Sequence, residues 1–259
     1  MDFINSIALK IDIFVMIITR ITGIIVIAPV FGSRNIPMQV KIGFSAIVAM
    51  ILFSAKQMPV YQFPDNLIPF ILILINEFII GLAIGFIANL IFAAIQLAGQ
   101  IIDMQMGFGI VNVIDPIFGT QVPMMGNFKY LLALMIYLAT NSHHILFKAL
   151  FQSYDIIPIM GFKFHGSLVD MILNVFIGMF TIALQISLPI VGALFVVEVA
   201  LGIIARTVPQ MNVFIVGMPA KIAVGFIMIM LILPFYVMFL ETIFNQNTQD
   251  ILTLLKLMR

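Results

Sequence analysis

Long apolar blocks separated by short polar breaks run along most of the chain. Six blocks approach or exceed the roughly 20 residues with which a helix crosses a hydrocarbon layer about 30 Å thick. We therefore predict an all-α, polytopic membrane protein built from long apolar helical hairpins. The predicted helices lie at about 13–32, 42–58, 67–98, 129–151, 168–197 and 213–240.

The breaks between these blocks are short, and none resembles a linker between independent domains. We therefore expect a single integral membrane domain over 1–259. The tail, 241–259, places its apolar side chains on one side of a helix, so it is predicted to be amphipathic and to lie at an interface or on a partner. No small-residue cleavage site follows the first apolar run, so we expect the N-terminus to be retained.

Composition supports a membrane protein and excludes other classes. Of the 259 residues, 63% are hydrophobic and 9% are charged, whereas soluble domains have about 45–50% and about 25%. The 12 Lys and Arg residues are balanced by 11 Asp and Glu residues, so no basic field favours nucleic acid. The chain has no cysteine, which excludes disulfides and thiolate metal ligands.

Ionisable residues inside or at the edges of the apolar blocks are the first functional candidates. A charge at the centre of a bilayer costs roughly 2.5–3.5 kcal/mol, so such a side chain faces protein or water. We expect this of Arg20 and Glu77. For Lys221 and Glu198, an equal alternative is that the side chain reaches the membrane interface from a helix end. The full set is Arg20, Glu77, Asp103, Glu198, Arg206 and Lys221.

Small and polar residues within the blocks indicate contacts between helices. Gly81 and Gly85 form a GxxxG pattern, which lets two helix backbones approach closely. Side chains such as Asn89, Gln96 and Ser187 are costly against lipid unless they are hydrogen-bonded. Contacts are therefore expected on more than one face of each helix, and we predict that the chain works inside a larger assembly.

No sequence pattern indicates catalysis. His143 and His144 are adjacent, so on a helix they point about 100° apart, and no third metal ligand accompanies them. The chain has no Walker loop, no GxGxxG pattern and no GxSxG turn. We predict that the protein is not an enzyme and that it binds no cofactor and no metal.

The connection between 99 and 127 is too polar to cross lipid and too apolar for a free surface loop. Irregular backbone at membrane depth is tolerated only where it is buried in protein or lines a water-filled cavity. We therefore predict a re-entrant or pore-plugging element, called here the plug loop (103–123), with a plain extramembrane loop as the alternative. Four methionines lie near its two ends, and their flexible side chains suit either a seal that opens and recloses or simple core filling. They are Met104, Met106, Met124 and Met125.

Five motifs in order carry a family resemblance. They are APVFGSRNIPMQVKIG at 28–43, EFIIGLAIGF at 77–86, QLAGQIIDMQMGFG at 96–109, DPIFGTQVP at 115–123 and ARTVPQMNVFIVGMPAKI at 205–222. Together they resemble the FliR family, the R component of the bacterial flagellar type III export gate, which is similar to the T component of virulence injectisomes. The resemblance covers about 12–240, and Ser142 stands where the family usually has Gly.

The resemblance implies a non-catalytic subunit of a larger complex. Such a subunit is present in a single copy beside several copies of the P and Q proteins, with the B switch protein and the A export protein nearby. The complex would form a closed helical pore that exports unfolded flagellar subunits across the bacterial inner membrane, within the flagellar basal body. Apolar surface would then contact sister subunits as well as membrane lipid.

The same resemblance assigns roles to individual residues. In the plug loop, Phe108 and Ile110 would occlude the pore, and Asp115 and Pro116 would form the turn. The whole plug set is Met104, Met106, Gly107, Phe108, Gly109, Ile110, Asp115, Pro116, Phe118 and Gly119. Assembly and packing would depend on Arg20, Arg34, Pro37, Glu77, Gly81, Gly85, Arg206, Pro209, Gln210, Asn212, Gly217 and Lys221.

Two other functional classes compete with this interpretation. In a secondary transporter, Glu77, Asp103 or Glu198 would carry protons and a broken helix would hold the substrate. The sequence shows no inverted repeat, which disfavours that class. In an intramembrane enzyme, turnover would depend on His143 or His144.

Overall fold

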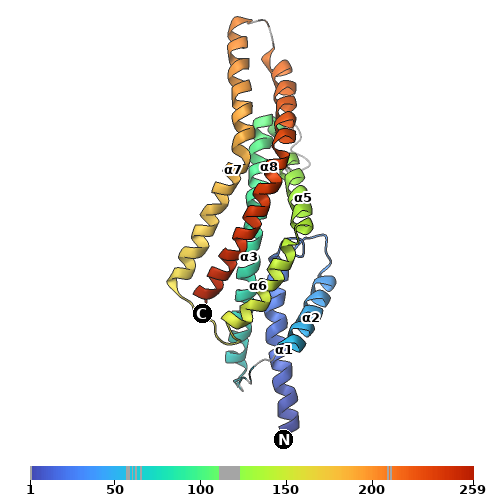
Figure 1. Cartoon of the computed structure of the whole chain (residues 1–259), viewed down its shortest axis with the longest axis vertical. Helices are drawn as coiled ribbons and strands as arrows, with labels where there is room; N and C mark the ends of the chain where they lie inside the picture. The colour runs from blue at the N-terminus through green and yellow to red at the C-terminus, as the bar shows by residue number, and fades with distance from the viewer. Residues whose placement is uncertain are drawn as a thin grey trace. The chain divides into compact units, whose positions relative to one another are not determined.

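The computed structural model describes residues 2–56, 59, 61, 63–64, 66–110, 123–208, 210 and 212–259, and for 2–8 and 110 it describes the backbone alone. Over these ranges the chain is helical and has no strand, which confirms the predicted all-α class. The elements (Figure 1) are α1 (Asp2–Ile27), α2 (Met38–Ala55), α3 (Leu67–Met106), the short 3-10 helix η1 (Phe108–Ile110), α5 (Met124–Ala139), α6 (Ser142–Ile156), α7 (Gly166–Thr207) and α8 (Val213–Leu257).

Four of the described helices, α2, α3, α7 and α8, are long and apolar enough to cross a membrane. The pair α5 and α6 adds a fifth candidate if the two helices are counted as one span bent by 67°. This confirms the predicted polytopic membrane protein.

The block predicted as one helix at 129–151 is two helices in the structure. Between them, Asn141 has a φ of 56°, in the left-handed region that Asn adopts more readily than most residues. The break falls in a run of five polar residues, 140–144, which the prediction of one helix over 129–151 passes through.

Four helices extend by eight or more residues beyond the apolar blocks that predicted them. α1 begins at Asp2, α3 continues to Met106, α7 runs from Gly166 to Thr207, and α8 continues to Leu257. Hydropathy detects the apolar stretch, whereas a helix continues through polar residues until its backbone changes direction. The plug loop therefore does not begin at 103: its first four residues are the last turn of α3. The helix ends before Gly107, whose φ of 90° favours glycine.

We expect one domain from the sequence, and the structure divides the chain into two compact units. Unit 1 comprises Met1–Leu90, Asn141–Val175 and Asn245–Arg259, and unit 2 comprises Ile91–Thr140 and Phe176–Phe244.

In unit 1, α1 packs against α2 and lies very close to α3. A Cβ atom on Gly23 would lie 2.5 Å from the carbonyl oxygen of Phe78, and a Cβ on Gly81 would collide with the carbonyl oxygen of Arg20. A Cβ on Gly85 would lie 2.9 Å from the carbonyl oxygen of Ile24. The GxxxG pattern thus serves a close helix contact within the chain itself.

The C-terminal tail is part of the unit 1 core. Ile251, Leu254, Leu255 and Met258 are buried there, and the backbone N–H of Lys163 donates to the carbonyl oxygen of Met258 at 2.9 Å. The apolar side of the tail, predicted to lie at an interface or on a partner, is therefore covered by the chain's own core residues.

In unit 2, Met106 is completely buried and packs against α8, where a Cβ on Gly225 would lie 2.6 Å from the methionine Cε. Elsewhere in the unit, the ring of Phe92 stacks on Phe244 with centroids 5.8 Å apart, and Tyr137 meets both rings edge-on. These contacts make the α3, α5 and α8 segments of the unit one packed group.

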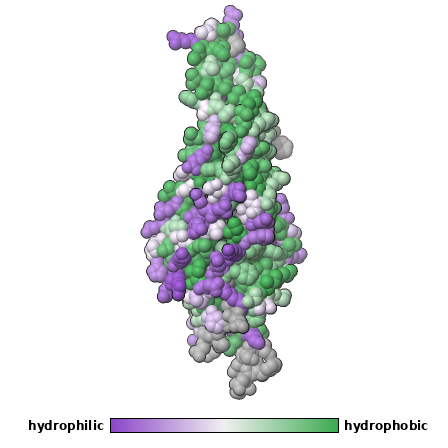
Figure 2. Space-filling view, viewed as in Figure 1, coloured by the Kyte–Doolittle hydropathy of each residue, from purple (hydrophilic) through white to green (hydrophobic). Residues whose placement is uncertain are grey.

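Much of the apolar surface of α7 and α8 is not covered by the chain. Only 17% of the most apolar window of each helix is buried. Figure 2 shows hydrophobic side chains over much of the unit 2 surface of these helices. An exposed apolar surface of this extent in a soluble monomer would be unusual, so lipid or other polypeptides must cover it.

We predict that Gly81→Ala destabilises unit 1, because its methyl group has to displace the backbone of α1 at Arg20. The expected loss is about 1–3 kcal/mol in the free energy of unfolding, measured by denaturant unfolding in detergent. The matched control is Gly178→Ala, whose Cβ would meet nothing within 4 Å. Equal stability of the two variants would contradict close α1–α3 packing.

Candidate functional site

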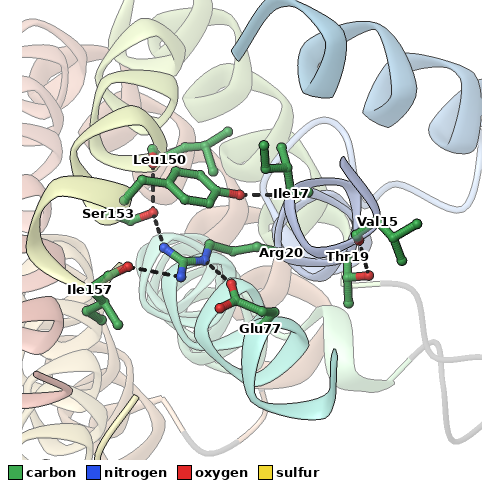
Figure 3. A network of polar contacts seen from close by, with 9 residues as sticks. Val15, Ile17, Thr19, Arg20, Glu77, Leu150, Ser153 and Ile157 are labelled. Carbon is green, nitrogen blue, oxygen red and sulfur yellow. Dashed lines mark hydrogen bonds and ion pairs between the residues drawn. The ribbon is translucent and has the colours of Figure 1, made fainter. Parts of the chain in front are cut away.

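A buried guanidinium joins three helices of unit 1. Arg20 on α1 is 0% exposed, and its Nε donates to Oε2 of Glu77 on α3 at 2.6 Å. Its Nη1 donates to Oγ of Ser153 on α6 at 3.0 Å, and its Nη2 donates to the carbonyl oxygen of Ile157 at 3.1 Å. Figure 3 shows these three bonds converging on one side chain.

The contact with Ile157 also satisfies the end of a helix. Ile157 follows the last residue of α6, where carbonyl oxygens lack partners within the helix and the helix dipole favours a cation. The ring of Tyr154 lies 4.1 Å from Arg20 Cζ, and its hydroxyl donates to the carbonyl oxygen of Ile17 at 3.2 Å. A side chain of α1 thus fixes the last turn of α6.

A second buried carboxylate lies in unit 2. Asp103, on the last turn of α3, is 6% exposed. Its Oδ1 accepts from the backbone N–H of Met125 at 3.0 Å, and its Oδ2 accepts from that of Gly126 at 3.2 Å. These N–H groups belong to the first turn of α5, which the negative charge stabilises through the helix dipole.

The third charged site of interest is at the surface of unit 2. Lys221 Nζ on α8 donates to Oε1 of Glu198 on α7 at 3.0 Å, and the glutamate side chain is 54% exposed. A largely apolar pocket of about 290 Å³ adjoins this pair. Its other lining residues are Gly107, Leu201, Gly202, Val213, Phe214, Gly217 and Met218.

The residues expected to serve assembly differ in their surroundings. Arg20, Glu77, Gly81 and Gly85 contact one another or neighbouring backbone inside unit 1. Gly217 is buried against Leu201, and Lys221 pairs with Glu198. Asn212 accepts from the N–H of Phe214 at 3.1 Å and so caps the start of α8. Exposed positions are Arg34, Pro37, Arg206 and Gln210, while Pro209 lies outside the described residues.

The plug set is described in part. Met104 is 74% exposed, whereas Met106 is fully buried, as core filling requires. Phe108 packs against the unit 2 core, and Gly109 has open space around its Cα. Of Ile110 only the backbone is described. Asp115, Pro116, Phe118 and Gly119 lie outside the described residues.

Some site residues carry no recognisable sequence signal. Ser153 and the carbonyl of Ile157 are 133 and 137 residues from Arg20, so their roles depend on tertiary packing. Lys129 begins an apolar block and therefore resembles a helix-end residue, yet it is 4% exposed and its Nζ lies 5.0 Å from the ring centroid of Tyr236.

The carboxylates required by a secondary transporter are already paired. Glu77 binds Arg20, Asp103 binds backbone N–H groups, and Glu198 binds Lys221. Among the described residues, no group of three or more His, Cys, Asp or Glu side chains could hold a metal ion. In this geometry the three carboxylates stabilise contacts between helices.

Comparisons with known proteins cover nearly the whole chain. The model of a family described as bacterial export proteins, family 1, matches residues 11–247. The flagellar biosynthetic protein FliR of Bacillus subtilis is 40% identical over 256 residues, which is 98% of each chain. FliR of Escherichia coli is 28% identical over 231 residues, covering 88% of this chain and 86% of its own. Yop proteins translocation protein T of Yersinia pestis is 27% identical over 221 residues, 84% of each chain.

We predict that Glu77→Leu lowers the free energy of unfolding by about 3–5 kcal/mol, because it leaves a buried guanidinium without its counter-charge. Unfolding of the detergent-solubilised protein measures this loss. The control is Glu198→Leu, which removes an exposed ion pair and should cost about 0–1 kcal/mol.

The double variant Arg20→Met with Glu77→Leu should recover much of the stability, since no unpaired charge remains. If Glu77→Leu costs no more than Glu198→Leu, the buried pair does not hold unit 1 together.

Proposed function

The chain belongs to the bacterial export proteins, family 1, and from this membership we propose that it is a non-catalytic subunit of the flagellar type III protein export gate. In this proposal it helps to form and seal the channel through which unfolded flagellar subunits cross the bacterial inner membrane. The flagellar name of the Bacillus subtilis relative, at 40% identity, favours the flagellar system over the injectisome.

The observation that carries the proposal is the length of uncovered apolar helix. α7 has 42 residues, and its unit 2 part alone exposes large apolar side chains from Phe176 to Ile204, which is about 42 Å along the helix. The hydrocarbon layer is about 30 Å thick, and a helix tilted by about 40° stays inside it for only about 40 Å. Lipid therefore cannot cover the whole surface, and apolar surfaces of other polypeptides are needed.

This requirement fits a subunit of a hetero-oligomeric complex. We propose that the P and Q export-gate proteins supply the covering helices, with this chain in a single copy. The B switch protein and the A export protein would dock nearby. The complex would lie in the inner membrane at the flagellar basal body, with lipid on its outside.

The plug loop supplies the seal in this proposal. Its described part leaves α3 at Gly107, and its other end enters α5 after Pro123. Phe108 and Ile110 are the proposed occluding groups, while Asp115, Pro116, Phe118 and Gly119 complete the plug. Met106 is assigned to core packing because α8 covers it.

Removing an apolar side chain that is exposed on α8 tests whether other polypeptides cover this helix in the complex. Phe214 is 77% exposed, and we predict that Phe214→Ser reduces the yield of complex recovered with this chain by roughly tenfold or more. A buried Phe contributes about 1.5–3 kcal/mol, and about 1.4 kcal/mol corresponds to a tenfold change in affinity. Gln210→Ser, an exposed polar position in the preceding connection, is the control, and equal yields would indicate that lipid covers this position.

Deleting residues 107–119 tests the seal. The deletion keeps Met106 in its packed site, so we expect the complex to assemble and its conductance to small ions in planar bilayers to rise far above that of the unaltered complex. The complex carrying Gly178→Ala serves as a control for preparation damage. An assembled deletion complex that conducts no more than this control would remove the plug from the proposal.

A further inference from the structure

Among the residues that the structure describes around the start of α5, no local side chain caps the helix. Pro123 precedes the helix, and it has neither a side-chain acceptor nor a free N–H. Met124, Met125 and Gly126 of the first turn also offer no hydrogen-bonding oxygen in their side chains. The backbone N–H groups of this turn therefore need an acceptor from elsewhere in the fold.

Asp103 provides that acceptor from another helix. Its two carboxylate oxygens accept hydrogen bonds from the backbone N–H groups of Met125 and Gly126, at 3.0–3.2 Å. An ordinary N-cap residue stands at the beginning of its own helix, whereas Asp103 lies 22 residues before Met125. The bond therefore satisfies a helix end and also ties two separate helices together.

An independent contact fixes the same junction. Gly99 lies one turn before Asp103 on the same face of α3. A Cβ atom on Gly99 would come within 2.5 Å of the backbone nitrogen of Gly126 and within 3.0 Å of the carbonyl carbon of Met125. The two backbones thus touch directly beside the carboxylate. Such a contact tolerates little change in the distance between α3 and the start of α5.

We propose that Asp103 is a positioning residue of the gate, an inference that rests on the proposed function. The plug loop runs from the end of α3 to the start of α5. Asp103 fixes the spacing between these two helix ends and so maintains the sealed state. The carboxylate acts through the helices and touches no exported chain. Its role is thus distinct from that of Phe108 and Ile110.

The first test is Asp103→Asn in the complete complex. The amide keeps the size of the side chain but turns one of the two acceptor atoms into a donor, which then faces a backbone N–H. We expect the yield of assembled complex to stay within about twofold, while ion conductance in planar bilayers rises roughly tenfold or more, as loss of charge-assisted hydrogen bonds implies. A D103N complex that seals like the unaltered one overturns the inference.

A second variant separates tethering from simple helix capping. Adding Pro123→Ser to D103N gives α5 a local cap, since serine is a favoured N-cap residue. If Asp103 fixes the spacing, the double variant regains thermal stability but still leaks. If the local cap restores sealing fully, Asp103 is only a helix cap and the inference is wrong.

Two comparisons complete the test. If D103N yields no complex, the Asp103→Glu variant tests the positioning role instead. Its longer side chain keeps the charge but displaces the start of α5. Leakage through the D103E complex would support positioning, and full sealing would contradict it. The deletion of 107–119 separates the two proposals. A leaky deletion with a sealed D103N refutes the positioning role alone, whereas a deletion that stays sealed refutes the plug itself.

Discussion

The thickness of the hydrocarbon layer constrains the whole molecule. A bilayer shields about 30 Å of helix, whereas the unit 2 part of α7 exposes large apolar side chains over about 42 Å. Neither water nor lipid is a suitable neighbour for all of this surface. Burial in a multi-subunit complex resolves the conflict.

The ionic groups complement this arrangement by acting mostly inside the chain. Arg20 and Glu77 hold α1, α3 and α6 of unit 1 together, and Asp103 joins α3 to α5 in unit 2. These charged side chains thus find their partners within the chain. The exposed surface of α7 and α8 remains largely apolar. The pair formed by Glu198 and Lys221 is partly exposed at the α7 and α8 surface.

The sequence predicts the helical class and the approximate position of every long helix, because apolar stretches of membrane length are unambiguous. It also identifies Arg20 and Glu77, since charges in apolar blocks need partners. It does not identify those partners, because a backbone carbonyl such as that of Ile157 has no sequence signature. The burial of the tail is hidden for a related reason, because it depends on tertiary packing. The turn at Asn141 falls in a polar run, 140–144, which the prediction of one helix over 129–151 passes through.

Native mass measurement of the detergent-extracted complex shows whether other polypeptides accompany this chain. We expect a particle far heavier than the 28.8 kDa chain, containing one copy of it and several copies of other apolar subunits. A stable, monodisperse monomer of 28.8 kDa from native membranes would show that no such complex forms.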